Sequence, residues 1–281
     1  MQYLDTGDRM PHAQHFTMGL WVPYLAFVTA AVGCYVGLCC VQQSRKYLTP
    51  AAGVCWLMMA ALSIGGVGIW LMHFIGMSGF SVPTSPVRYD LGATLFSVVL
   101  AVGATLFGLL ISDARLSAAR RLPRSVSLTV GGIVMGTAIV LMHYSGMAAI
   151  RIRGTIDHDP RMVAVSAAIG IVGSVAAMWM FDVPGKLHVR VASSLLLACG
   201  VVALHYTGMV GMSAHVDLDA SAPEGMTVPS LLFPAFGIGI VLLAVPIVAL
   251  LLAPESDREL DDRGQLNDLS RVGKASTEAD Q

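Results

Sequence analysis

Long apolar runs without charged residues alternate with short polar connections along most of the 281-residue chain. A helix that spans a bilayer needs about 20 mainly apolar residues. Seven runs meet this requirement and contain no Asp, Glu, Lys or Arg: residues 20–41, 51–79, 91–112, 126–150, 162–181, 191–213 and 229–252. The pattern therefore predicts an all-α polytopic membrane protein, a bundle of seven transmembrane helices.

The composition supports a membrane location. Hydrophobic residues make up 55% of the chain, charged residues only 12%, and the mean hydropathy is +0.70. Soluble domains carry about 25% charged residues. We therefore expect a multi-pass protein that has the lipid bilayer as a partner and does not bind nucleic acid.

The placement of basic residues predicts the orientation. If the N-terminus is outside, five Lys and Arg residues fall in outer segments, and twelve fall in inner connections and the C-terminal tail. Inner loops of membrane proteins are enriched in basic residues. The N-terminus is thus predicted outside and the C-terminus in the cytoplasm.

Four segments are predicted. Residues 1–19 form a polar outer segment without the basic region of a signal peptide, and residues 20–214 form a membrane domain of six helices. Residues 215–254 comprise an outer loop and the seventh helix. Residues 255–281 carry many charges and few apolar residues, which predicts a disordered cytoplasmic tail too short for a kinase, cyclase or DNA-binding domain.

A short motif occurs three times in the six-helix domain. Its histidines, His73, His143 and His205, lie 70 and 62 residues apart, and each is followed by an aromatic residue, a variable residue, Gly and Met. Each copy lies near the end of the second helix of a pair, at residues 71–77, 141–147 and 203–209. The domain is therefore predicted to contain three two-helix repeats.

These motifs are expected to lie in one layer near the outer surface, because their helices all run outward. His and Met are four residues apart and share a helix face, and the intervening Gly leaves room for close approach. The candidate metal ligands are His73, Met77, His143, Met147, His205 and Met209. Auxiliary candidates are Met72, Met142, His12 and His15. Tyr144, Tyr206 or a backbone carbonyl is expected to accept a hydrogen bond from the second ring nitrogen.

Imidazole and thioether ligands together favour copper. The carbonyl groups at three converging helix C-termini also favour a cation. Haem ligated by two of the histidines is an alternative, and buried His and Met that serve only helix packing are another. Since the spans contain no set of catalytic groups for hydrolysis or group transfer, the chain is not predicted to be an enzyme.

The three copies resemble the MHYT family of bacterial integral membrane sensor domains. They read Met72-His73-Phe74-Ile75, Met142-His143-Tyr144-Ser145 and Leu204-His205-Tyr206-Thr207. The resemblance covers about residues 20–214. It implies a bacterial plasma membrane protein with a copper site near the outer face that senses oxygen, carbon monoxide or nitric oxide.

These features support three functional hypotheses. The first is a copper-binding sensor of a diatomic gas or redox state that lacks its own output domain and acts through a separate signalling protein. The second is a copper-handling protein for uptake, storage or delivery, with a metal-delivery partner. The third is a haem-binding protein in electron transfer. The glycine-rich helix faces would also permit a homo-oligomer.

Overall fold

The structure is a computed structural model that describes residues 19–47, 49–83, 85–113, 123–182, 187–217 and 219–253. The predicted tail at residues 255–281 lies outside the described residues, as do the auxiliary candidates His12 and His15 and nearly all of the segment 1–19.

Within the described residues, seven helical spans are long and apolar enough to cross a membrane, which confirms the predicted all-α class. Each begins and ends within four residues of its predicted bounds. The spans are α1 (Trp21–Ser44), the second span Pro50–Met77, α4 (Leu91–Ser112), α5 (Arg124–Ala148), α6 (Pro160–Asp182), α7 (Leu187–Val210) and α8 (Val228–Leu251).

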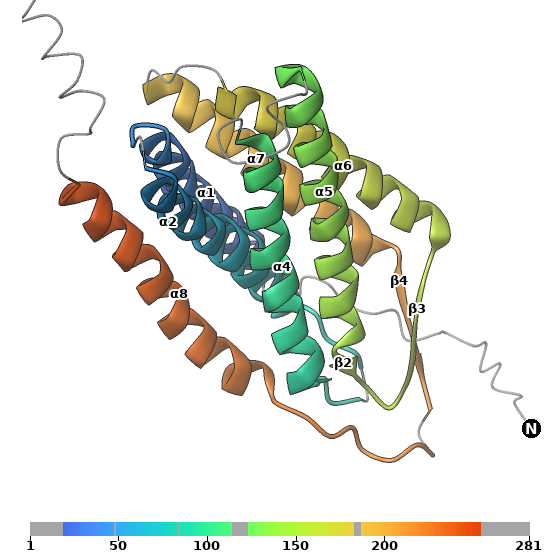
Figure 1. Ribbon diagram of the computed structural model, residues 1–281. Helices are drawn as coiled ribbons and strands as arrows, with labels where there is room; N and C mark the ends of the chain where they lie inside the picture. Colours follow the sequence, from blue (N-terminus) through green and yellow to red (C-terminus); the bar gives the residue numbers. More distant parts are fainter. Residues whose placement is uncertain are drawn as a thin grey trace, which may run out of the picture.

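The first six spans form a closed ring of three helix pairs (Figure 1). Each helix packs on the next one along the chain, and α7 closes the ring by packing on α1. The motif-bearing helices of the three pairs also contact one another inside the ring. Helix α8 packs on the second span and on α1, outside the ring. The predicted organisation of three two-helix repeats plus a seventh helix is therefore correct.

The second span has an irregular centre that the sequence analysis missed. It consists of α2 (Pro50–Ala61), the π-helix η1 (Leu62–Leu71) and α3 (Met72–Met77). It contains three glycines, and a Cβ at Gly65 would lie 2.7 Å from the carbonyl oxygen of Ala101, so α4 packs closely against η1. π-Helical segments occur frequently at functional sites, and this one leads directly into the first motif.

Short antiparallel strands cover the motif end of the bundle (Figure 1). Strand β1 (Arg88–Tyr89) pairs with β2 (Ile150–Arg151), and β3 (Gly154–His158) pairs with β4 (Met212–Val216). These segments were predicted only as outer loops. Each pair joins segments that are far apart in the sequence. Strands this short also carry no local sequence pattern that would predict them. The cap links loops from all three repeats. Strand β4 extends past residue 214, the predicted end of the six-helix domain.

The opposite end of the bundle carries an ionic cluster. The Asp182 carboxylate lies 2.5 Å from an Arg124 guanidinium nitrogen and 3.5 Å from one of Arg45. Arg124 also donates a hydrogen bond to the carbonyl oxygen of Ser112. The cluster thus joins the ends of α1, α4, α5 and α6. By the charge distribution, this is the predicted cytoplasmic end, and the orientation stays a prediction.

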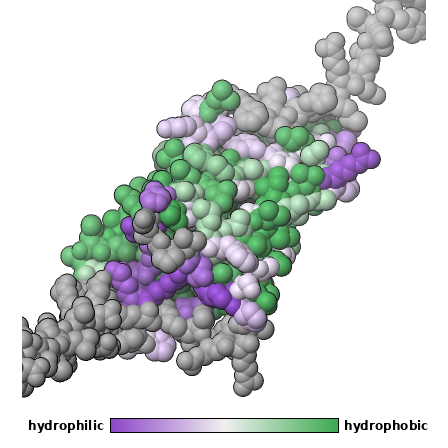
Figure 2. Space-filling model, turned by 90° about the horizontal axis from the view of Figure 1, so that it is seen from above, coloured by the Kyte–Doolittle hydropathy of each residue, from purple (hydrophilic) through white to green (hydrophobic). Residues whose placement is uncertain are grey.

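Apolar side chains cover much of the outer surface of the bundle (Figure 2). Several large ones are more than half exposed, such as Phe96 and Val99 on α4 and Phe233 on α8. Lipid tails are as apolar as these side chains, so a bilayer can solvate this surface. The helices and their surface therefore fit a multi-pass membrane protein.

Candidate metal centre

Three buried histidines meet at the centre of the helix ring. His73 lies on α3, His143 on α5 and His205 on α7, and each is 1% exposed. The Nδ1 atom of His73 lies 3.1 Å from Nδ1 of His205 and 3.2 Å from Nδ1 of His143. The predicted common layer of motif histidines is therefore present in the structure.

The imidazole rings have a nearly threefold arrangement. Their centroids are 5.0 Å, 5.0 Å and 5.2 Å apart, with interplanar angles of 90°, 88° and 86°. One ligand nitrogen from each ring lies within 4.8 Å of the other two. Three separate repeats thus direct the same kind of donor atom to one point, and we call these residues the His triad.

The motif glycines hold the rings in a cyclic pattern. A Cβ added at Gly146 of the second copy would meet Nε2 of His73 of the first copy. A Cβ at Gly208 would overlap Nε2 of His143, and one at Gly76 would overlap His205. The glycines of the second and third copies therefore make room for the histidine of the preceding copy. The glycine of the first copy makes room for the histidine of the third, which closes the cycle. The expected close approach at these glycines is confirmed, and the approaching group is another motif histidine.

The donor set fits one small ion. Three nitrogens that bind an ion in one plane at about 2.0 Å lie about 3.5 Å apart, close to the two Nδ1 distances of 3.1 and 3.2 Å. A neutral imidazole carries a proton on one nitrogen and a lone pair on the other. Ligation through Nδ1 would put the proton on Nε2, which for His73 and His143 is buried without a hydrogen-bond partner among the described residues.

The predicted methionine ligands are buried next to this layer. Met77, Met147 and Met209 are 0%, 1% and 2% exposed, and each lies one helical turn from its motif histidine toward the strand cap. Because positions four apart share a helix face, the thioethers are on the cap side of the triad. Their role as ligands stays a prediction.

The auxiliary methionines occupy a different position in the motif. Met72 and Met142 are each 1% exposed and correspond to Leu204 in the third copy. The Leu204 side chain packs against Gly170 and near Val140, in the interface of α7 with its neighbours. A residue adjacent to the histidine points about 100° away from it around the helix, since there are 3.6 residues per turn. The position is therefore suited to packing between helices.

Tyr144 has a different partner from the one expected. Its hydroxyl lies 2.7 Å from Oγ of Ser166. Nε2 of His143 has no hydrogen-bond partner among the described residues, so Tyr144 is not its acceptor. Its ring packs edge-on against His143 and also against His158 on β3. Nε2 of His158 is buried without a hydrogen-bond partner among the described residues. Burial lowers the pKa of His158, and the charge of Asp157 opposes the shift.

Sequence reasoning missed His158 as a residue close to the site. It lies outside the repeated motif, 15 residues beyond His143, so the repeat does not mark it. Its proximity depends on the turn back of β3 over the end of α5, and no signal in the sequence reports that turn.

The sequence matches the family MHYT, described as a bacterial signalling protein N-terminal repeat, over residues 66–128 and 136–194. The two matches begin on the helices that bear the first and second motifs. The chain belongs to the MHYT family, and the predicted resemblance is confirmed. Together with the seven apolar spans, this identifies a multi-pass membrane protein of bacteria.

Curated relatives are bacterial signalling proteins. The bifunctional diguanylate cyclase/cyclic di-GMP phosphodiesterase MucR of Pseudomonas aeruginosa is 40% identical over 160 residues, which are 55% of this chain and 22% of MucR. The signaling protein YkoW of Bacillus subtilis is 31% identical over 220 residues, 75% of this chain and 26% of YkoW. The cyclic di-GMP phosphodiesterase NbdA of Pseudomonas aeruginosa is 30% identical over 210 residues, 70% of this chain and 26% of NbdA.

The chain thus spans about a quarter of the length of the curated relatives that it matches. No solved structure matches it.

Proposed function

We propose that the chain is a membrane sensor in which the His triad binds one copper ion. The observation that carries the proposal is the convergence of three buried Nδ1 atoms from three repeats. Imidazole nitrogens bind copper in either oxidation state, and the adjacent thioethers of Met77, Met147 and Met209 would favour Cu(I). A copper ion held there would supply a centre for binding a diatomic gas or for a one-electron change.

The arrangement of the helices favours a sensor. The triad joins α3, α5 and α7, so any change in its ligand geometry acts on all three repeats at once. The ring of helix pairs extends from the triad to the cluster of Arg45, Arg124 and Asp182 at the other end. Altered packing at the triad would thus reach the predicted cytoplasmic face. We propose no catalytic role for the chain itself.

The partner that reads this change is proposed from the relatives. Two of them carry names of enzymes that make or degrade cyclic di-GMP. The partner of this chain would then be an output module of cyclic di-GMP signalling, and the chain would supply its membrane input.

The geometry gives no support to the haem alternative. Two axial nitrogens at about 2 Å on opposite sides of an iron atom lie about 4 Å apart, with a wide macrocycle between them. The triad Nδ1 atoms are closer, at 3.1 and 3.2 Å, and the three ring centroids lie 5.0 to 5.2 Å apart. The motif glycines lie directly against the Nε2 side of the rings, which supports a site for a single ion.

Copper uptake or delivery remains the second candidate, because a triad that binds copper would also serve storage. The two functions differ in the step after copper binds. A sensor changes conformation with gas or redox state without moving metal, whereas a carrier accumulates metal in vesicles.

The test is the metal content of the detergent-purified chain by mass spectrometry, together with its absorption spectrum. We expect about one copper ion per chain in the wild type and none in the variant with His73, His143 and His205 all changed to alanine. The matched control is His188→Ala, which removes an exposed histidine at the opposite end of α7 and should keep copper. Folded protein that takes up no copper, or that shows a haem absorption band, would contradict the proposal.

The methionines allow a separate prediction about the oxidation state. We expect Met147→Leu, which keeps a similar volume, to weaken Cu(I) binding about tenfold and to leave Cu(II) binding nearly unchanged, since only the soft ion gains from a thioether. Competition with a chelator for each oxidation state measures both affinities. Met178→Leu is the control, because Met178 is equally buried but lies on α6 outside the motifs. Equal effects of the two variants on Cu(I) binding would show that the thioether takes no part.

A further inference from the structure

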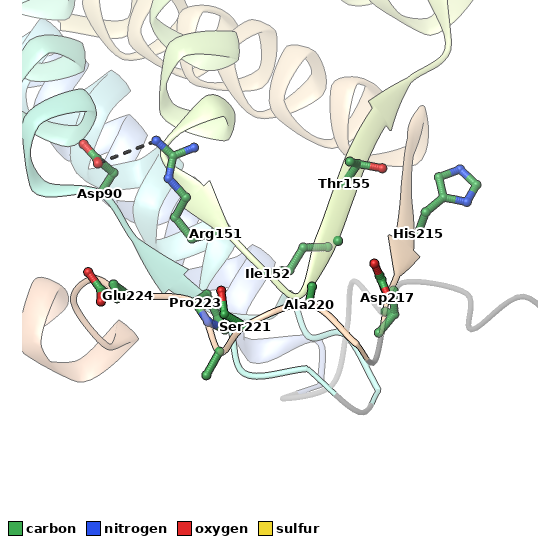
Figure 3. A pocket seen from close by; sticks show the side chains of 13 residues that line it. Asp90, Arg151, Ile152, Thr155, His215, Asp217, Ala220, Ser221, Pro223 and Glu224 are labelled. Carbon is green, nitrogen blue, oxygen red and sulfur yellow. Dashed lines mark ion pairs between the residues drawn. The ribbon is translucent and has the colours of Figure 1, made fainter.

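Two pockets adjoin under the strand cap. One has a volume of about 820 Å³ and the other about 360 Å³. Both are lined by the turn from β2 to β3, with Arg151, Ile152, Gly154 and Thr155 shared between them. Figure 3 shows the larger pocket between β2, β3 and β4, with side chains from the segment before α8 along its rim.

The larger pocket has an acidic lining. Its carboxylates are those of Asp90, Asp217 and Glu224, and Arg151 is the one guanidinium among its lining residues (Figure 3). That guanidinium is 3.6 Å from the Asp90 carboxylate. A hydrogen bond from the backbone N–H of Ala93 lowers the pKa of Asp90, so this carboxylate is charged at neutral pH. A cleft lined mainly by one sign of charge raises the local concentration of the opposite ion, here a cation.

The smaller pocket extends from this acidic region to the metal-binding layer. Met147 and His158 both line it, together with Arg151, Thr155 and several small or apolar residues. A thioether and an imidazole are thus present in one cavity, and Nε2 of His158 is buried without a hydrogen-bond partner among the described residues. A buried imidazole nitrogen without a partner costs free energy. Coordination of a cation by the lone pair of this nitrogen would offset that cost.

The smaller pocket lies beside the His triad. Met147 lies one turn from His143 on the same face of α5. His158 and His143 both pack edge-on against the ring of Tyr144, with centroids 5.6 Å and 4.9 Å from it. A cation in the pocket would therefore be next to the triad but separated from it by side chains.

We propose that the pocket lined by Met147 and His158 is a second metal site, through which a soft monovalent cation such as Cu(I) reaches the triad. This inference rests on the proposed copper-binding function of the triad. The acidic pocket attracts the ion, and the imidazole and thioether of the smaller pocket replace its hydration shell. A shift of Met147 from the pocket toward the axis then brings the ion to the His triad. Two donors bind the ion more weakly than three, so it moves on to the triad.

The test measures the rate of Cu(I) loading. Full-length protein in detergent is mixed without oxygen with a coloured Cu(I) chelator complex, and the loss of colour reports transfer to the protein. We expect His158→Phe, which keeps an aromatic ring against Tyr144 but has no donor, to slow loading at least tenfold. The final amount of copper bound should equal that of the wild type. His158→Met, which restores a soft donor, should load at close to the wild-type rate.

A second variant tests the same pocket without changing a donor. Thr155 is exposed on β3 and lines both pockets, so Thr155→Trp should block the passage between them and also slow loading. If His158→Phe does not fold, the loading rate of Thr155→Trp decides whether the pocket takes part in copper loading. His188→Ala, at the opposite end of the bundle, is the control and should load normally.

The outcomes separate the two proposals. Wild-type protein that takes up no Cu(I) at all would contradict the function proposed for the triad. If the wild type loads and both His158→Phe and Thr155→Trp load within twofold of its rate, the triad proposal stands and the loading site is overturned.

Discussion

We expect Gly208→Ala, which adds a single methyl group, to weaken copper binding at the His triad strongly. The new Cβ would overlap Nε2 of His143, whose ring is already enclosed by Tyr144 and the two other triad rings. The imidazole must therefore move away from the axis, and its Nδ1 atom leaves the position that completes the site. We expect copper affinity to fall by about 10- to 100-fold, the cost typical of disturbing the groups that orient a metal ligand.

The same substitution should also lower stability. Overpacking in a filled core costs about 1–3 kcal/mol, whereas alanine gains up to about 1 kcal/mol over glycine from its helix propensity. The balance is a net loss, which thermal unfolding in detergent would measure. Because the glycine contacts are cyclic, Gly76→Ala and Gly146→Ala should have the same two effects.

Gly103→Ala is the matched control for these variants. Gly103 is also a helical glycine, on α4, but a Cβ there would meet nothing within 4 Å. It should keep copper and be as stable as the wild type or slightly more so. A Gly208→Ala protein that binds copper as the wild type does would contradict the assignment of the site to the triad.

The spans and the shared depth of the motifs could be predicted because both depend on local patterns. Charge-free apolar runs define the spans, and the recurrence of His, Gly and Met marks equivalent positions on three helices. Once the second helix of each pair runs outward, His73, His143 and His205 must lie in one layer. Glycine at the third position after His also predicted close approach.

The details of the site depend on contacts between distant residues, which no local pattern contains. The sequence does not report that Gly146 receives His73, or that Gly208 receives His143. It also does not report the π-helix η1, which packs against α1 and α4, or the strand pairs of the cap. His158 was missed for the same reason, because only the fold of β3 brings it to Tyr144.

The second large effect is expected at the opposite end, where Asp182→Asn should destabilise the bundle by about 1–2 kcal/mol. Nε and Nη2 of Arg124 donate to the Asp182 carboxylate, and Arg45 lies 3.5 Å away. Hydrogen bonds to a charged group contribute about 1.5–3 kcal/mol, but each side chain is about one-third exposed, so solvent screening reduces the value. Asparagine keeps the shape but removes the negative charge that both guanidinium groups contact.

The pH dependence of this effect identifies the carboxylate as its cause. The hydrogen bonds from Arg124, and the charges of Arg124 and Arg45, lower the pKa of Asp182 in the folded protein. A carboxyl group with a lowered folded pKa contributes stability that is complete above its unfolded pKa of about 3.9 and is lost as the pH falls through the folded value. The gap in unfolding temperature between wild type and Asp182→Asn should therefore be constant above about pH 5 and shrink below about pH 4. A gap that persists unchanged at low pH would mean that the lost shape, and not the charge, destabilises the variant.

The same variant tests whether the cluster transmits the state of the triad. Asp182 ends α6 and Arg124 begins α5, so their ion pair links two repeats that also meet at the triad through His143 and His205. If the ends of the bundle are coupled, copper should protect the amide hydrogens at the inner ends of α5 and α6 from exchange in the wild type, and about tenfold less in Asp182→Asn. Copper affinity itself should change little, because the cluster touches no ligand. Equal protection in both proteins would mean that copper acts only on its own end of the bundle, and the sensor would then need another route to its partner.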